Sequence, residues 1–219
     1  MVGMLSLRSI PTPVRRRTSP STAERVRVLD EFNTSVRRPD AHGGLACLPL
    51  VLDALAEDEG RPDGTRWIVD ENARLDMAAL LRHCFPRPDI HVAAAEYGAA
   101  AHKRGWLRLD RAMRTHEYTC LAETAEGWAE TDRTFDDVLQ AYGRPSVIFG
   151  DQDPRSAKTL GYASDDRTDP LAVFHFDEAG GALSARLLAF RSGDDLFGTS
   201  MAFTPFGEAV ADEHERRHN

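Results

Sequence analysis

The spacing of apolar residues changes near residue 130, and this change constrains the fold more than any other feature of the sequence. Before it, apolar residues recur every three or four positions, as in 48–55, which is the period of a helix. After residue 145, apolar and other residues alternate within short runs, as in 171–176, which is the period of a strand. The first part of the chain therefore predicts helices, and the second part predicts a sheet.

Five short β-rich runs follow residue 145. They are residues 146–149, 159–163, 171–176, 182–191 and 196–203. The breaks between them are short and rich in Gly, Pro, Asp and Ser, a composition typical of turns. Because connections this short join antiparallel neighbours, the runs predict a five-stranded antiparallel meander.

A helix is expected directly before the sheet. Thr134 suits its N-cap, Phe135 and Val138 fall on one face, and Gly143 followed by Pro145 ends it. The predicted fold class is α+β, with an N-terminal helical lobe followed by a helix packed on the five-stranded antiparallel meander.

The predicted organisation has four parts. Residues 1–39 are a disordered basic leader and lead-in, 40–130 the helical lobe, 131–207 the helix plus antiparallel sheet, and 208–219 a polar tail. The leader carries prolines and six arginines against one glutamate within residues 1–27, without apolar periodicity. Its Arg15–Arg17 triplet is the one segment that suggests contact with nucleic acid.

One stripe in the helical half carries polar as well as apolar residues. Its members recur at helical spacing and are Leu109, Met113, His116, Cys120 and Thr124. We expect a helix with this stripe facing the core. A short strand at 67–69 and a helix through 75–84 are also expected.

Charge and composition exclude several classes of protein. The chain has 35 acidic residues against 27 Lys and Arg, for a formal charge of −8. This acidity disfavours a dedicated nucleic-acid binder, and no apolar run reaches the 18 residues of a membrane span. The three cysteines, Cys47, Cys84 and Cys120, are too few and too dispersed for a disulfide framework. A cytoplasmic protein is expected.

Two motifs resemble metal sites. HERRH at 214–218 matches the zinc-binding H-E-x-x-H pattern, but its position at the end of the sequence and its two arginines favour a solvated tail. In HEYTC at 116–120, His116 and Cys120 have the spacing of ligands, with His83, Cys84 or His91 as further donors. Their place on the core stripe favours a buried histidine and thiol instead. We predict no metal and no cofactor.

The acidic turns are the candidate binding site. Alternate turns of a meander lie at the same end of the sheet, and two of them carry five carboxylates, namely Asp165, Asp166, Asp169, Asp194 and Asp195. This rim would suit a protein partner with a basic surface. The alternative is that Asp simply favours turns, and the opposite end of the sheet is also acidic.

The segment TFDDVLQAYGRPSVIF at 134–149 resembles the small module of BamE/SmpA-type lipoproteins and β-lactamase inhibitor proteins. The resemblance covers residues 131–207. It implies a helix ending in a Gly-x-Pro turn, followed by an antiparallel sheet that grips a partner protein. The lipobox cysteine of the lipoproteins is absent, and the resemblance transfers no functional residue.

Three functional hypotheses follow. The first is a non-enzymatic, bacterial-type protein-binding protein, of immunity or inhibitor type, that acts through the acidic rim. The second is a small enzyme with an acid–base site between the helical lobe and the sheet, drawn from His83, His91, His116 and His175. The third is a regulator that uses the Arg15–Arg17 arm.

Overall fold

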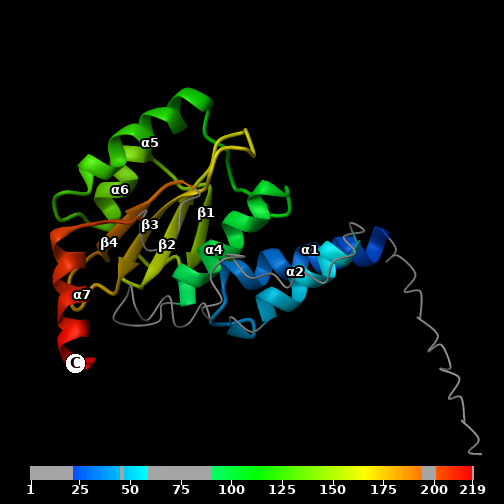
Figure 1. Ribbon diagram of the computed structural model, residues 1–219, viewed down its shortest axis with the longest axis horizontal. Coiled ribbons are helices and arrows are strands. Elements are labelled where there is room, and N and C mark those ends of the chain that lie inside the picture. Colours follow the sequence, from blue (N-terminus) through cyan, green and yellow to red (C-terminus); the bar gives the residue numbers. More distant parts are fainter. Residues whose placement is uncertain (1–21, 45–46, 59–89, 194–200, 219) are drawn as a thin grey trace, which may run out of the picture.

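The computed structural model describes residues 22–44, 47–58, 90–193 and 201–218, which form six helices and a five-stranded sheet (Figure 1). The helices are α1 (Thr22–Arg37), α2 (Cys47–Asp58), α4 (Ile90–Lys103), α5 (Thr115–Trp128), α6 (Phe135–Tyr142) and α7 (Pro205–His218). The strands are β1 (Val147–Gly150), β2 (Lys158–Tyr162), β3 (Ala172–Asp177), β4 (Arg186–Arg191) and β5 (Met201–Phe203). None of these helices is long and apolar enough to cross a membrane.

The sheet confirms the predicted α+β class and meander. Its strands follow one another in the order β1-β2-β3-β4-β5, and every neighbouring pair is antiparallel. Phe174 on β3 lies opposite Leu160 on β2 and Phe190 on β4. The predicted strand at 67–69 and helix through 75–84 lie outside the described residues.

Helices α5 and α6 cover one face of the sheet (Figure 1). This face is aromatic, because strand residues of one parity bring Tyr162, Phe174 and Phe176 to the same side. The rings of Tyr162 and Phe174 meet edge to face with centroids 5.6 Å apart. The prediction for α6 is confirmed, since Thr134 caps its N-terminus and Phe135 is buried.

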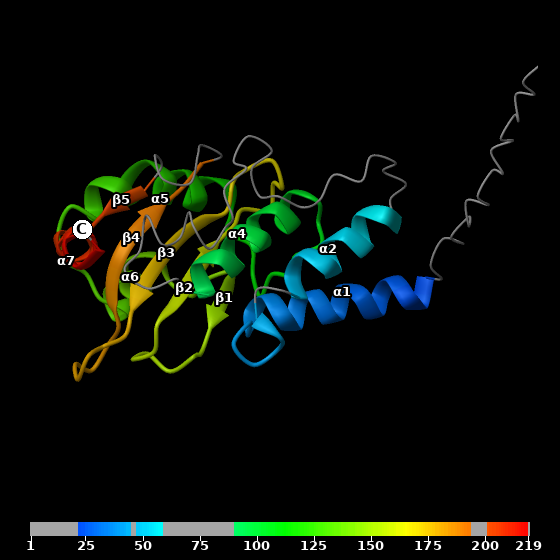
Figure 2. The same ribbon diagram turned by 60° about the horizontal axis from the view of Figure 1, so that its bottom comes forward.

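Helix α4 covers the opposite face, with α1 and α2 packed against it (Figure 2). Alanines 93–95 are fully buried and allow α4 to lie close to the strands. At Gly98 the approach is so close that an added Cβ would lie 2.5 Å from the Phe149 ring. Helices of both halves of the chain therefore sandwich the sheet.

The predicted disordered leader, residues 1–39, is wrong for residues 22–37, which form α1. Phe32 and Val36 are fully buried, and Asn33 donates to the Trp106 carbonyl at 2.8 Å. Val28, Phe32 and Val36 recur every four residues, so a helical signal was present. The arginines around it obscured that signal. Residues 1–21, including Arg15–Arg17, lie outside the described part of the chain.

Most of the predicted polar tail, residues 208–219, belongs to α7, which runs beside β4 (Figure 1). Thr204 starts this helix, because its Oγ1 accepts from the Gly207 amide at 3.0 Å and donates to the Leu187 carbonyl at 2.7 Å. A Cβ at Gly207 would lie 2.0 Å from the Leu188 carbonyl oxygen. The absence of a side chain there lets the helix contact the strand backbone.

The predicted stripe of α5 is also wrong. His116, Cys120 and Thr124 are exposed, and the face that packs on the sheet carries instead Tyr118, Leu121 and Ala125. Both stripes have helical spacing, but the second buries the larger apolar side chains. The predicted core histidine and buried thiol therefore lie at the surface.

Candidate functional site

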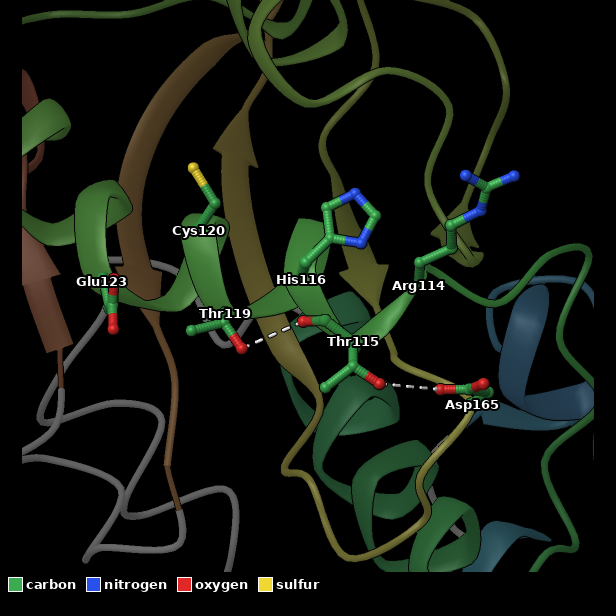
Figure 3. Close-up of a pocket in the computed structure, with 7 residues that line it drawn as sticks. All are labelled: Arg114, Thr115, His116, Thr119, Cys120, Glu123 and Asp165. Carbon is green, nitrogen blue, oxygen red and sulfur yellow. Dashed lines mark hydrogen bonds between the residues drawn. The ribbon is translucent and has the colours of Figure 1, made fainter.

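The acidic turn between β2 and β3, residues 164–170, is fixed against the N-terminal end of α5 (Figure 3). Met113 and Ser164 form a β-bridge just before the helix. The Tyr118 hydroxyl donates to the Pro170 carbonyl at 2.5 Å, and Thr115 Oγ1 lies 3.5 Å from Asp165 Oδ1. The turn and the helix therefore present one continuous surface.

The three predicted binding residues in this turn differ in their surroundings. Asp166 Oδ1 accepts from the Thr168 amide at 2.8 Å and from its hydroxyl at 2.7 Å, and these bonds lower the pKa of Asp166. Asp169 Oδ2 accepts from Ser164 Oγ at 2.6 Å. Asp165 is exposed and lines a surface depression. Asp166 and Asp169 thus build the turn, while Asp165 faces outward.

The other two predicted binding residues, Asp194 and Asp195, lie outside the described residues. The described part of the acidic rim therefore consists of the 164–170 turn.

The depression beside Asp165 is open and has a volume of about 700 Å³. Its lining residues are Arg114, Thr115, His116, Thr119, Cys120, Glu123 and Asp165. His116 and Cys120 point away from Asp165, so the two donors of HEYTC do not converge with this carboxylate (Figure 3). Within the described ranges, no three His, Cys, Asp or Glu residues are grouped to hold a metal ion.

HERRH lies on α7, a helix remote from this depression in the fold (Figure 1). His214 is half-buried there. The helical context required for H-E-x-x-H is therefore present, while its described neighbours Asp212, Glu213 and Arg216 are exposed. The side chains of Glu215 and His218 lie outside the described part of the structure. Whether HERRH is arranged as a set of metal ligands therefore stays untested.

A larger acidic surface extends along α5 beyond the depression. Residues 115–132 contain five carboxylates and neither Lys nor Arg. Glu123, Glu126 and Glu130 are exposed and form no ion pair with any residue that the structure describes. Sequence reasoning overlooked this surface because it considered only carboxylates in turns. The lack of basic residues over 18 positions was the available signal.

The histidines proposed for an enzyme site are dispersed. His175 is fully buried on β3, where Nδ1 lies 2.9 Å from Thr159 Oγ1, and burial lowers its pKa to about 3. It belongs to the α4 side of the sheet, whereas His116 is exposed on α5, on the opposite side. His91 is the second residue of α4, where its Nδ1 atom would lie 3.1 Å from a Cβ added at Gly150 on β1, and His83 lies outside the described residues. His116 and His175 therefore do not share one acid–base site.

A buried ion pair accompanies His175. Arg191 on β4 donates to Glu96 on α4, and the side chains of both are only 6% exposed. Burial raises the pKa of Glu96, and the positive charge of Arg191 opposes this effect. The pair connects a helix to a strand inside the fold and is shielded from solvent, so it resembles a structural contact more than a reactive site.

No family model matches the chain, and neither a curated protein nor a solved structure matches it. The resemblance of residues 131–207 to the BamE/SmpA and inhibitor modules therefore stays a prediction. The functional argument depends on the chemistry of the surface itself.

Proposed function

We propose that this chain is a non-catalytic, bacterial-type protein of the reducing cytoplasm that binds a basic partner protein, in the manner of an immunity or inhibitor protein. The proposed docking surface, called here the acidic ridge, consists of Glu123 and Glu126 on the outer side of α5, Glu130 just beyond its end, and Asp165 in the 164–170 turn. The free thiols of Cys47 and Cys120 fit a reducing compartment.

One observation carries the proposal, namely the run of exposed carboxylates on α5 without a basic residue among them. On a solvated helix that serves only to cover a sheet, acidic and basic residues are usually interspersed, because oppositely charged neighbours stabilise it. Glu123 and Glu126 are i,i+3 neighbours of like charge on the helix surface, an arrangement that costs free energy. A basic partner would offset that repulsion.

The residues that follow α5 also favour α5 as the docking surface. Residues 115–143 carry seven carboxylates and one arginine, Arg133, whose guanidinium lies 4.5 Å from the Trp128 ring centroid. Asp132 is already paired with Arg186 and also accepts from the Phe206 amide, so it belongs to the fold. The carboxylates available to a partner are therefore concentrated on α5.

The test compares two variants that remove the same number of charges. The first, Glu123→Gln/Glu126→Gln/Glu130→Gln/Asp165→Asn, neutralises the acidic ridge. The matched control, Glu31→Gln/Glu178→Gln/Glu208→Gln/Asp212→Asn, neutralises four exposed carboxylates elsewhere. Proteins captured from bacterial lysate by the wild type are quantified by mass spectrometry against both variants.

The captured partner is then purified and its association kinetics are measured at two ionic strengths. Because attraction between opposite charges accelerates encounter and salt screens it, the ridge variant should associate several-fold more slowly with a flatter salt dependence. The control should keep the wild-type rate. Equal rates for all three proteins, or equal losses in both variants, would contradict the proposed surface.

A further inference from the structure

Residues 1–21, called here the basic arm, carry four arginines and no acidic residue. Three of these arginines are consecutive, Arg15–Arg17, and the fourth is Arg8. The arm therefore holds a charge of +4 that none of its own residues balances, in a chain whose formal charge is −8. Such a segment is attracted to an acidic surface that lacks cations of its own.

The acidic ridge is a surface of this kind. Its four carboxylates form no ion pair with any residue that the structure describes. Arg114 lines the same depression as Asp165, but its guanidinium points away from that carboxylate (Figure 3). Other acidic regions contain their own cations, since Asp151 is paired with Arg38 at 3.3 Å and α7 includes two arginines among its carboxylates.

The dimensions of the arm and the ridge are compatible. Glu123 and Glu130 are seven residues apart, which corresponds to about 10 Å along a helix axis. Three consecutive residues of an extended chain, such as Arg15–Arg17, span about 7 Å between the first and the last. Because a guanidinium binds a carboxylate through two parallel hydrogen bonds, the triplet could engage more than one carboxylate of the ridge.

The position of α1 directs the arm towards another copy of the chain. The buried residues of α1 all lie in its second half, and its start at Thr22 projects away from the sheet (Figures 1 and 2). This helix lies on the α4 side of the sheet, whereas α5 covers the opposite face. Since an extended chain spans at most about 3.6 Å per residue, Arg15 stays within about 25 Å of Thr22. The arginine triplet therefore remains on the side of its own molecule that lacks the ridge.

We propose that the basic arm of one copy docks on the acidic ridge of a second copy. Each copy has one arm and one ridge, so two copies can exchange arms reciprocally and close a dimer. The contact consists of exposed ion pairs, and it is therefore weak and sensitive to salt. The exchange shares the acidic ridge with the proposed function but needs no other protein.

Sedimentation equilibrium of the full chain tests the exchange without a partner, from micromolar to millimolar protein concentration. At low ionic strength we expect the weight-average mass to rise from that of a monomer towards that of a dimer. The mass should return to that of a monomer in 1 M salt, where the Debye length is about 3 Å. A chain that stays monomeric at low ionic strength, or that self-associates equally in 1 M salt, would overturn the proposal.

Two variants that each remove four charges separate the two sides of the contact. The arm variant is Arg8→Gln/Arg15→Gln/Arg16→Gln/Arg17→Gln, and the ridge variant is the one used for docking. Each should be monomeric by itself, because it lacks one side of the contact. Their mixture should form a 1:1 complex, because each supplies the side that the other lacks. The matched control, with four carboxylates neutralised elsewhere, should self-associate like the wild type.

NMR locates the contact in the same mixture. The arm variant, whose ridge is intact, is labelled with 15N and titrated with the unlabelled ridge variant. The amide signals of residues 119–130 should shift, while those of β2 and β3 stay in place. A mixture that remains monomeric, or shifts that are confined to another surface such as α7, would refute the exchange.

The exchange and the proposed function can fail separately. Self-association is measured without a partner, whereas docking kinetics are measured at nanomolar concentration, where a weak contact between copies does not form. A wild type that does not self-associate leaves the docking of a basic partner on the ridge intact. A lysate that yields no partner leaves the exchange of arms intact.

Discussion

The two faces of the sheet are built from different chemistry. The face under α5 and α6 is filled by rings, with Phe174 in contact with Tyr162, Tyr142 and Phe190. The face under α4 combines small alanines with buried polar groups, namely the Glu96–Arg191 pair and the His175–Thr159 hydrogen bond. Strand residues of both parities are buried, so the two faces differ in the kind of group that they bury.

This difference determines which part of the fold makes the stability of the chain depend on pH. Aromatic packing contributes through buried area and ring contacts, which do not titrate. Buried ionisable groups contribute only while they keep the protonation state that the fold requires. The α4 face should therefore respond strongly to acid. On the α5–α6 face shape should dominate, although the buried Lys158, with its Nζ atom 4.8 Å from the Phe135 ring centroid, adds a charge there.

The largest effect is expected at the buried ion pair. Arg191→Met leaves Glu96 buried without its cation, which should lower the free energy of unfolding by about 3 kcal/mol. Urea denaturation at pH 7 measures it. The double variant Glu96→Leu/Arg191→Met removes both charges and should be clearly more stable than the single variant. A double variant as unstable as the single one would show that packing, not charge, determines the cost.

The next effect is the pH dependence that His175 creates. Its pKa is lowered to about 3 in the folded state, whereas in the unfolded chain it stays near 6.5. As the pH falls below 6.5, His175 is protonated in the unfolded chain but stays neutral in the folded chain. Stability due to His175 is therefore present above pH 6.5 and is lost progressively as the pH falls towards 3. Between pH 7 and pH 5 the expected loss is about 2 kcal/mol.

The measurement is the free energy of unfolding at both pH values for the wild type and for His175→Gln. Glutamine can still bond to Thr159 but does not titrate, so the variant should lose about 2 kcal/mol less than the wild type on acidification. His116→Gln is the control, because this histidine is exposed on the other side of the sheet. If acidification lowers the free energy of unfolding equally in the wild type, His175→Gln and His116→Gln, then His175 does not cause the pH dependence.

The aromatic face provides the contrasting case. Phe174→Leu retains most of the apolar volume but removes the ring contacts with Tyr162 and Phe190, which should cost about 1.5 kcal/mol. This loss should be the same at pH 7 and pH 5. A loss that grows on acidification would show that the stability of the aromatic face is coupled to the charged groups of the α4 face.

The same contrast explains how much could be predicted from sequence. The aromatic face could be predicted because Ala172, Phe174 and Phe176 alternate along one strand, and the antiparallel meander could be predicted because the connections between the β-rich runs are short. The partners of His175 and Arg191 come from other elements, Thr159 on β2 and Glu96 on α4, and no local spacing connects them. Only the packing of α4 on the sheet brings them together.

The helices show the same limit. For α6, the cap, the apolar face and the terminating glycine all indicated one helix, and it was predicted correctly. For α5, two stripes fitted the helical period equally well, and tertiary packing selected the one with Tyr118 and Leu121. For the proposed binding surface, the 164–170 turn was singled out by its composition, and its binding to a partner stays a prediction. The exposed side of α5 required knowing which stripe is buried.

The smallest effect tests whether α6 depends on the local signals that predicted it. Thr134 Oγ1 accepts from the Asp137 amide at 3.3 Å, and Asp137 Oδ2 accepts from the Thr134 amide at 2.8 Å, so the two residues cap each other. Thr134→Ala removes the side-chain cap and should lower the free energy of unfolding by about 1 kcal/mol. The control, Thr119→Ala in α5, removes a hydroxyl that only bonds back to the Thr115 carbonyl, and it should be neutral or slightly stabilising because alanine favours helices. If both variants lose the same stability, the hydroxyls matter for a reason other than capping, and α6 is held by its packing on the aromatic face alone.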